Sequence, residues 1–246
     1  MLKKLYDKSK IWFAVVWIAA YCILMSVADG LSARVGIDKS VTLGVGVLLS
    51  AALLLFLIKN RLLGEYGLCA PKCTAASMLF YLPVLVMLTA NTWYGVTLNY
   101  GPLETVLYIL SMICIGFLEE VIFRGLLFEA MREHSLKAAI VVSSLTFGFG
   151  HIINLVNGSG AQLLPNILQV VYATAAGFMF VLMYYKSKSI IVCIAAHGLF
   201  NALSAFANEA AATDGMRILS AVLLTVITGS YAVYLALSMK REAKKQ

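Results

Sequence analysis

Long apolar stretches alternate with short polar connections along the whole chain. A helix that crosses a bilayer needs about 20 mostly apolar residues, within a range of about 17–25. By this criterion the pattern predicts eight such helices, at residues 11–28, 41–58, 73–90, 102–132, 137–154, 162–185, 189–207 and 216–239. The predicted fold class is all-α, a polytopic membrane protein in which residues 1–246 form a single integral-membrane helical domain.

Two of these helices are predicted to depart from a straight span. Pro83 lies inside the third helix, where a proline removes an intrahelical hydrogen bond and is expected to cause a kink. The fourth helix begins at Pro102, a residue suited to a first helical turn, and continues to Arg132 or Glu133. That length exceeds one bilayer, so the helix is expected to tilt or to project into water.

Composition supports a membrane protein and changes how the charge is interpreted. Hydrophobic residues make up 61% of the chain and charged residues 13%, whereas soluble domains have about 45–50% and about 25%. The formal charge of +7 is typical of cytoplasmic loops in a membrane protein. We therefore expect the lipid bilayer among the partners, and no nucleic acid. The five cysteines lack metal-type spacing and are interpreted as small buried apolar residues.

The distribution of lysine and arginine tests the helix count independently. With the N-terminus in the cytoplasm, fifteen of the 19 basic residues fall on the cytoplasmic side: Lys3, Lys4, Lys8, Lys10, Lys59, Arg61, Lys72, Arg132, Lys137, Lys186, Lys188, Lys240, Arg241, Lys244 and Lys245. Arg34, Lys39 and Arg217 fall outside, and Arg124 lies within a helix. The positive-inside rule expects this asymmetry for eight spans. Both termini are therefore predicted to be cytoplasmic.

Three charged residues lie close together in the fourth apolar segment. They are Glu119, Glu120 and Arg124, and a charge at the centre of a spanning helix costs about 2.5–3.5 kcal/mol on insertion scales. Glu120 and Arg124 are four residues apart, so they share a helix face and are predicted to form a supporting ion pair. Glu119 points about 100° away from Glu120 and has no partner on its own helix. It is the first candidate for a functional group.

Polar residues on two other predicted helices fall at a similar depth. His151 ends the sequence Phe147-x-x-x-His151, and His197 and Asn201 share one helix face. At 1.5 Å per residue, Glu119 and His151 lie about 20 Å from the cytoplasmic ends of their helices, and His197 and Asn201 about 12 and 18 Å. We expect these four side chains to converge. Gly148 and Gly150 beside His151, and Gly198 beside His197, are expected to permit close helix approach.

This set of groups suits hydrolysis by an activated water. Desolvation raises the pKa of a carboxyl group toward a value useful in a general base, and an imidazole can help to orient the water. A second imidazole and a carboxamide can donate hydrogen bonds to a developing oxyanion. A zinc site made by Glu119, His151 and His197 is the metal-dependent alternative, and no cofactor is otherwise expected. In a purely structural alternative, the same groups only hold helices together.

The motifs resemble those of a known membrane family. Glu119-Glu120-x-x-x-Arg124, Phe147-x-x-x-His151 and His197-x-x-x-Asn201 occur in this order on successive apolar segments within residues 100–207. Together they resemble the CPBP family, which includes the type II CAAX prenyl endopeptidases and bacteriocin-immunity relatives. The resemblance implies an eight-helix intramembrane protease whose site opens toward the cytoplasm.

The resemblance also implies roles for individual residues. Glu119 would be the general base and His151 would hold the water, while His197 and Asn201 would stabilise the oxyanion. Glu120, Arg124 and Asn154 would support them. The family has been described both as metalloproteases and as glutamate-dependent enzymes without metal, so the metal-dependent alternative stays open.

The substrate implied is a membrane-embedded or lipid-anchored protein or peptide, of which a prenylated CAAX protein is one form. Short connections favour a bacterial plasma membrane as the location. Two other functions use the same residues. One is a non-catalytic immunity or scaffold protein, and the other is a proton-coupled transporter, although no repeated halves are visible in the chain.

Overall fold

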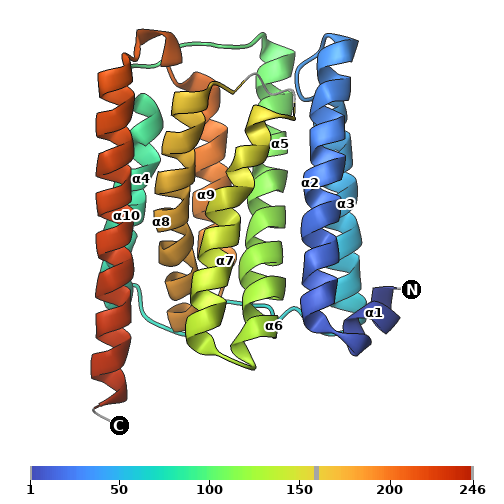
Figure 1. The fold of residues 1–246 in the computed structure, drawn as a ribbon, viewed down its shortest axis with the longest axis vertical. Coiled ribbons are helices and arrows are strands. Elements are labelled where there is room, and N and C mark those ends of the chain that lie inside the picture. Colours follow the sequence, from blue (N-terminus) through green and yellow to red (C-terminus); the bar gives the residue numbers. More distant parts are fainter. Residues whose placement is uncertain (1, 158–160, 245–246) are drawn as a thin grey trace.

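The structure, a computed structural model, describes residues 2–157 and 161–244. In this part of the chain the regular structure is helical, and the only β-type pairing is an isolated bridge between Val96 and Ala207. The helices form an elongated bundle (Figure 1). The α-helices are α1 (Leu2–Lys8), α2 (Lys10–Val35), α3 (Ser40–Lys59), α4 (Leu82–Leu88), α5 (Pro102–Glu120), α6 (Glu129–Arg132), α7 (Leu136–Gly150), α8 (Leu163–Ser187), α9 (Ile191–Leu203) and α10 (Asp214–Ala243).

Six helical segments of the described chain are long and apolar enough to cross a membrane. They are Lys10–Val35, Ser40–Lys59, Pro102–Arg132, Leu136–Leu155, Leu163–Ser187 and Asp214–Ala243. Two further apolar segments, Ala76–Thr92 and Ile191–Phe206, are shorter. The all-helical membrane fold is therefore confirmed, whereas a topology of eight complete spans stays a prediction.

The third predicted helix is not continuous, and the prediction of a kink at Pro83 is wrong. Leu79, Phe80 and Tyr81 have positive φ angles, which break the helix before α4 begins. Pro83 lies in the first turn of α4, where the missing N–H has no intrahelical acceptor to lose. The break is bridged by α10, because the Tyr231 hydroxyl donates a 2.6 Å hydrogen bond to the Met78 carbonyl.

The fourth predicted helix is continuous, but its centre is a π-helix. The segment η3 (Val121–Phe128) follows directly after Glu120 and leads into α6, and all eight of its residues are buried. A π turn opens the hydrogen-bonding ladder and is common beside functional sites. The Ser143 hydroxyl of α7 donates a 2.8 Å hydrogen bond to the Phe123 carbonyl within this turn. Ser143 therefore has a structural partner here.

The two ends of the bundle differ in charge and in the segments that form them. The N-terminus, the C-terminus, α1 and α6 lie at one end, which we call the N/C end (Figure 1). Lys10 there pairs with Glu65 and Glu133, and Lys186 pairs with Glu242. The opposite end, which we call the distal end, carries the connections 36–39, 89–101 and 204–213 and the described residues 156–157 and 161–162.

The distal end holds all three basic residues that the charge pattern placed outside the cytoplasm. Lys39 pairs there with Asp29, Arg217 pairs with Asp214, and Arg34 lies in the last turn of α2. The fold therefore places these three basic residues at the opposite end of the bundle from the residues predicted to be cytoplasmic, as the charge pattern predicts. Lys245, one of the predicted cytoplasmic residues, lies outside the described residues.

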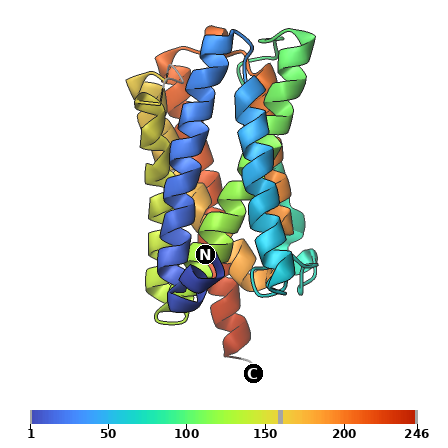
Figure 2. The ribbon, with the colours of Figure 1, turned by 90° about the vertical axis from the view of Figure 1, so that its right-hand side faces the viewer.

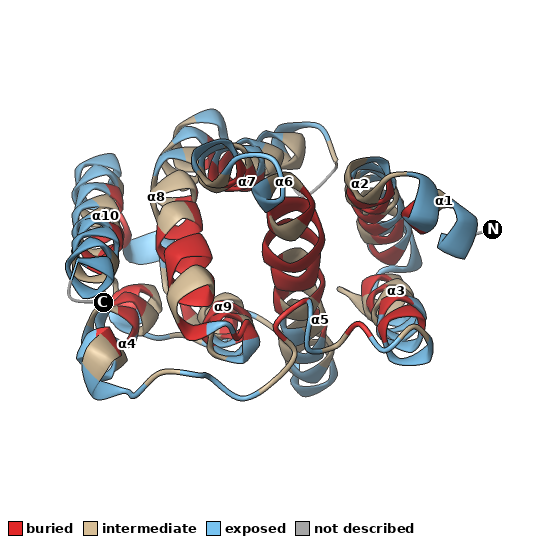
Figure 3. Cartoon of the chain, turned by 90° about the horizontal axis from the view of Figure 1, so that it is seen from below, coloured by how far each residue is buried: buried red, intermediate tan, exposed pale blue. Residues whose placement is uncertain are grey.

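The centre of the bundle is built around α5 and α8. Helix α5 packs against α3 and α9, and α8 packs against α7 and α10. Seen along the bundle axis, the buried surfaces face this centre and the outer helices present exposed surfaces (Figure 3). The hairpin of α2 and α3 forms one side of the molecule (Figure 2). Large apolar side chains such as Trp12 and Leu48 are exposed on it, as expected where a helix faces lipid.

The cysteine interpretation is correct for one residue only. Cys193 is buried, whereas Cys22, Cys69, Cys73 and Cys114 are half-buried. The five are free thiols. Their positions differ because a cysteine in an apolar run is buried only if its helix face meets another helix.

Candidate active site

The buried ion pair that was expected within the fourth helix is present. Arg124 Nη1 donates a 3.0 Å hydrogen bond to Glu120 Oε1, and both side chains are fully buried. The guanidinium carbon of Arg124 also lies 4.0 Å from the centroid of the Phe147 ring and 5.4 Å from that of Phe180. Aromatic faces stabilise a desolvated cation. The pair and its two rings form a rigid support beneath the neighbouring polar groups.

His197 lies between the two adjacent carboxylates of α5. Its Nδ1 atom is 2.8 Å from Glu120 Oε1, and its Nε2 atom is 3.4 Å from Glu119 Oε2. The ring also stacks on Phe180, with centroids 5.9 Å apart. Both nitrogens of the imidazole therefore face carboxylates. The oxyanion role that the resemblance implied for His197 stays a prediction.

Glu119 has a partner that the sequence analysis missed. The Tyr21 hydroxyl of α2 donates a 2.6 Å hydrogen bond to Glu119 Oε1. The Glu119 side chain is 13% exposed, unlike that of the fully buried Glu120. A tyrosine inside an apolar helix is a usable signal, because a buried phenol needs a hydrogen-bond partner. The charges and histidines alone did not reveal it.

His151 is positioned by groups on α7 and α8. Its Nδ1 atom is 3.0 Å from the Phe147 carbonyl oxygen. A carbonyl can only accept, so Nδ1 carries a hydrogen, and Nε2 has the lone pair when the ring is neutral. The buried Asn166 of α8 donates a 2.8 Å hydrogen bond from Nδ2 to the His151 carbonyl oxygen, and this residue was also missed. The bond fixes the point at which α7 gives way to the short 3₁₀ segment η4 (His151–Leu155).

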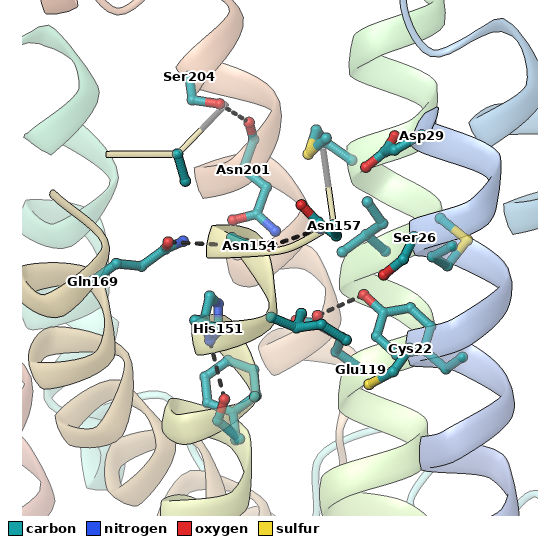
Figure 4. Close-up of a pocket in the computed structure, with 18 of the residues that line it drawn as sticks. Cys22, Ser26, Asp29, Glu119, His151, Asn154, Asn157, Gln169, Asn201 and Ser204 are labelled. Carbon is teal, nitrogen blue, oxygen red and sulfur yellow. Dashed lines mark hydrogen bonds between the residues drawn. The ribbon is translucent and has the colours of Figure 1, made fainter. Parts of the chain in front are cut away.

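A cavity of about 390 Å³ brings the predicted polar groups together. Glu119, His151, Asn154 and Asn201 line it, from α5, η4 and α9. Figure 4 shows these residues around one space, with Glu119 on the side of α2 and His151 on the side of α8. The Asn154 side chain bonds to Gln169 Oε1 at 3.3 Å. Of the four side chains expected to converge from their depth, Glu119, His151 and Asn201 line this cavity, and His197 does not.

His197 lines a smaller adjoining cavity instead. This second space has a volume of about 40 Å³ and shares His151 and Asn201 with the first. Its other walls are mainly apolar and include Ala173 and Leu224. The structure thus places His197 behind Glu119, as seen from the main cavity.

Close helix approach is provided by a partly different set of glycines from the one predicted. A methyl group at Gly116 would lie 2.6 Å from the backbone of Gly198, so α5 and α9 touch at this point. A methyl group at Gly148 would lie 2.8 Å from Thr174 Cα of α8. Gly150 has nothing within 4 Å of such a group, so its predicted role is wrong. The α5–α9 contact lies one turn from Glu119 and brings it to His197.

The donor atoms do not fit the zinc site considered for Glu119, His151 and His197. Among residues 2–157 and 161–244, no group of three or more His, Cys, Asp and Glu side chains is placed to hold an ion. The three side chains do not line one space, because His197 is absent from the lining of the main cavity that Glu119 and His151 share.

The class of protein follows from these observations. The described chain is a helical integral membrane protein with spans long enough to cross a bilayer. It encloses a polar cavity lined by a carboxylate, an imidazole and carboxamides. Ionisable groups at membrane depth mark functional sites.

A comparison with known families identifies this class more closely. Residues 101–203 match the model of the family described as type II CAAX prenyl endopeptidase Rce1-like. The match confirms the CPBP resemblance drawn from the motifs. The match supports intramembrane protease activity in general. No curated protein and no solved structure shows significant similarity to the chain.

Proposed function

We propose that this protein is an intramembrane endopeptidase that hydrolyses a peptide bond of a membrane-associated protein or peptide with water activated by Glu119 and His151. The observation that carries the proposal is the shared cavity. A carboxylate, an imidazole and the Asn201 carboxamide line one space, and all three lie within residues 101–203, which match the family model. General bases of this kind contribute about 10²–10⁴-fold to a rate.

The proposed reaction begins with a water held between Glu119 and His151 Nε2. Glu119 accepts one proton of the water, and the oxygen attacks the carbonyl carbon of the peptide bond. The carbonyl oxygen becomes negatively charged, and the Asn201 amide donates a hydrogen bond to it. When the C–N bond breaks, Glu119 returns the proton to the leaving amine. The products are a carboxylic acid and an amine, which exchange one proton to become a carboxylate and an ammonium group, so atoms and charge balance.

His197 is assigned a positioning role in this scheme. Because its nitrogens lie 2.8 Å from Glu120 and 3.4 Å from Glu119, it couples the orientation of the base to the buried Glu120–Arg124 pair. The oxyanion contact implied by the resemblance is then left to Asn201. Asn201→Ala is expected to lower kcat with little change in KM, since the amide acts only once the charge has formed. His197→Gln is expected to lower kcat and also to shift its pH profile, because the surroundings of Glu119 change.

The decisive experiment compares cleavage by the wild type with cleavage by Glu119→Gln in purified, detergent-solubilised protein. A mixture of membrane-peptide substrates, with and without a prenylated cysteine, is the probe. Glu104→Gln is the matched control, because Glu104 lies in the first turn of the same helix and outside the cavity lining. Cleavage is expected to fall by about 10²–10⁴-fold in Glu119→Gln and to stay unchanged in Glu104→Gln.

Two further measurements separate this proposal from other functions. Cleavage that persists after exhaustive chelation, without stoichiometric zinc, supports the metal-free scheme. Equal cleavage by the wild type and Glu119→Gln would contradict the assignment of the base. A proton flux in proteoliposomes that Glu119→Gln abolishes, without any cleavage, would instead support a transporter.

A further inference from the structure

The cavity beside Glu119 occupies only the distal half of the bundle. On α2 its lining runs from Tyr21 to Asp29, in the part of the helix farther from Lys10 and the N/C end. On α7 and η4 it runs from Phe147 toward the distal connection and includes Asn157. Figure 4 shows Ser26 and Asp29 successively farther along α2 from Glu119. The space therefore extends from the base toward the distal end.

The half of the bundle beneath the cavity is closed by packing. Every residue of η3 is buried, from Val121 to Phe128. A run of buried residues on α8, Met179–Tyr184, faces the same region, and the Phe128 ring lies 5.7 Å from that of Tyr184. Side chains packed in this way leave no room for a substrate from the N/C end.

The mouth of the cavity is formed by the distal connections. Lys39, Asn91, Ala161 and Glu209 are cavity-lining residues from this end of the bundle. The Glu209 side chain is 62% exposed, so this end of the lining reaches the surface. Tyr21, which contacts Glu119, is eight residues before Asp29, or about 12 Å along the helix. About four residues of an extended peptide would cover that distance at roughly 3.3 Å each.

Charge determines which side of the membrane this mouth faces. The N/C end carries Lys3, Lys4, Lys8, Lys59 and Arg132 among its basic residues. Basic residues in short connections are retained in the cytoplasm, and this bias sets the orientation of a polytopic chain. The distal end is then on the non-cytoplasmic side. This conclusion is incompatible with a site that opens toward the cytoplasm, as the resemblance implied.

We infer that the cavity opens to the non-cytoplasmic side, so that its substrate is a peptide segment in the outer half of the bilayer or at its outer surface. Such a segment would enter extended through the distal mouth and reach Glu119 within about four residues. The substrate class rests on the proposed function. The direction of access rests only on the cavity and the charge pattern.

Thiol labelling tests the direction of access without requiring activity. The five native cysteines are replaced, and Ser26→Cys is introduced because Ser26 lines the cavity. A second variant keeps only Cys69, which lies at the N/C end, where its thiol is 3.4 Å from the Lys188 carbonyl oxygen. A third variant keeps only Cys22, a native residue of the cavity lining. A charged, membrane-impermeant maleimide is applied to spheroplasts and to inside-out vesicles of a bacterial host.

The expected result is opposite labelling of the two ends. Ser26→Cys and the Cys22-only variant react in spheroplasts, and the Cys69-only variant reacts only in inside-out vesicles. Leu48→Cys in the cysteine-free chain is the control for lipid exposure, because Leu48 is 71% exposed on the apolar surface of α3. It is expected to react with the charged reagent from neither side.

Any other pattern at the cavity overturns the inference. An outward-facing mouth is contradicted if both cavity variants are labelled only from the cytoplasmic side or from the same side as Cys69. It is also contradicted if neither variant is labelled from either side. Adding Glu119→Gln to the Ser26→Cys chain is expected to leave the labelling unchanged. A failed cleavage assay with outward labelling would therefore reject the proposed function and leave the direction of access intact.

Discussion

The two halves of this bundle handle charged side chains in opposite ways. In the half toward the N/C end, Glu120 and Arg124 are fully buried and are held by each other, by His197 and by the rings of Phe147 and Phe180. In the distal half, Asp29 and Lys39 form a 2.8 Å pair with 20% of each side chain exposed. Glu119 lies at the boundary, with His197 on one side of it and the cavity on the other.

The difference shows how a membrane protein can hold a reactive carboxylate in place and still admit water to it. Charges enclosed by protein interact strongly and must be satisfied by protein groups, so the packed half fixes the geometry. Charges near water are screened, so the open half tolerates change. We expect substitutions in the two halves to differ in cost accordingly.

The largest effect is expected from breaking the buried pair. Arg124→Met leaves Glu120 desolvated without its cation, which should destabilise the protein by about 3–5 kcal/mol. Lys39→Met breaks the pair at the distal mouth and should cost only about 0–1 kcal/mol. Unfolding of both variants in the same detergent measures the difference. Similar losses in the two would remove the distinction between the halves.

A double substitution sharpens this result. Glu120→Gln combined with Arg124→Met removes both charges, and apolar or neutral replacement of a whole buried pair is often close to neutral. The double variant is therefore expected to be more stable than Arg124→Met alone. If it is less stable, the cost of Arg124→Met comes from lost packing around Phe147 and not from the unpaired carboxylate.

Tyr21→Phe tests Glu119, the residue at the boundary between the two halves. The substitution removes the 2.6 Å hydrogen bond to Glu119, and a hydrogen bond to a charged group contributes about 1.5–3 kcal/mol. Tyr108→Phe is the matched control, because Tyr108 also lines the cavity but its hydroxyl lies 2.8 Å from the neutral Ser204 hydroxyl. Loss of this neutral hydrogen bond should cost about 0.5–1.5 kcal/mol. Cleavage is expected to decrease in Tyr21→Phe and to change little in Tyr108→Phe.

The helix contact that brings Glu119 to His197 is tested by Gly116→Ala. The added methyl group would lie 2.6 Å from the Gly198 backbone, and overpacking of this kind costs about 1–3 kcal/mol. Gly44→Ala is the control, because Gly44 lies in α3 and nothing is within 4 Å of an added methyl group. Thermal unfolding should detect a loss of stability in Gly116→Ala and none in Gly44→Ala. Cleavage should fall with it if α9 is displaced from α5.

The smallest effect is expected at the surface of the N/C end. The hydrogen bond from Lys10, 2.7 Å from Glu133, lowers the pKa of the Glu133 carboxyl group. A carboxyl group whose pKa is lowered in the folded state stabilises the protein at pH values above its ordinary pKa. This stabilisation is lost as the pH falls through the folded-state pKa. Since the pair is partly exposed, its contribution should be only about 0.2–1 kcal/mol.

The measurement compares the thermal midpoints of the wild type and Glu133→Gln between neutral and acidic pH. The wild type should be slightly more stable at neutral pH, and the two should converge below the ordinary glutamate pKa of 4.5. Addition of 1 M salt at neutral pH should also reduce the difference. A difference that grows as the pH falls would have the wrong sign for this ion pair.

The sequence alone determined the helical membrane fold and three of the residues that line the cavity. Apolar segments of spanning length report directly on the bilayer, because only internally hydrogen-bonded helices or closed barrels can cross it. Glu120 and Arg124 were paired correctly because residues four apart on a helix are neighbours whatever surrounds them. Glu119, His151 and Asn201 were brought together correctly because rise per residue converts sequence position into depth.

Only the tertiary structure decided how those groups are arranged. The break at Leu79–Tyr81, the π turn after Glu120 and the bond from Tyr21 to Glu119 each depend on contacts between segments far apart in the chain. The position of His197 between two carboxylates, and the end at which the cavity opens, arise in the same way. Periodicity and spacing describe one helix at a time. The end at which the cavity opens and the hydrogen-bond partner of each side chain depend on how several helices pack together. The depth of the site was therefore readable along the chain, and its orientation was not.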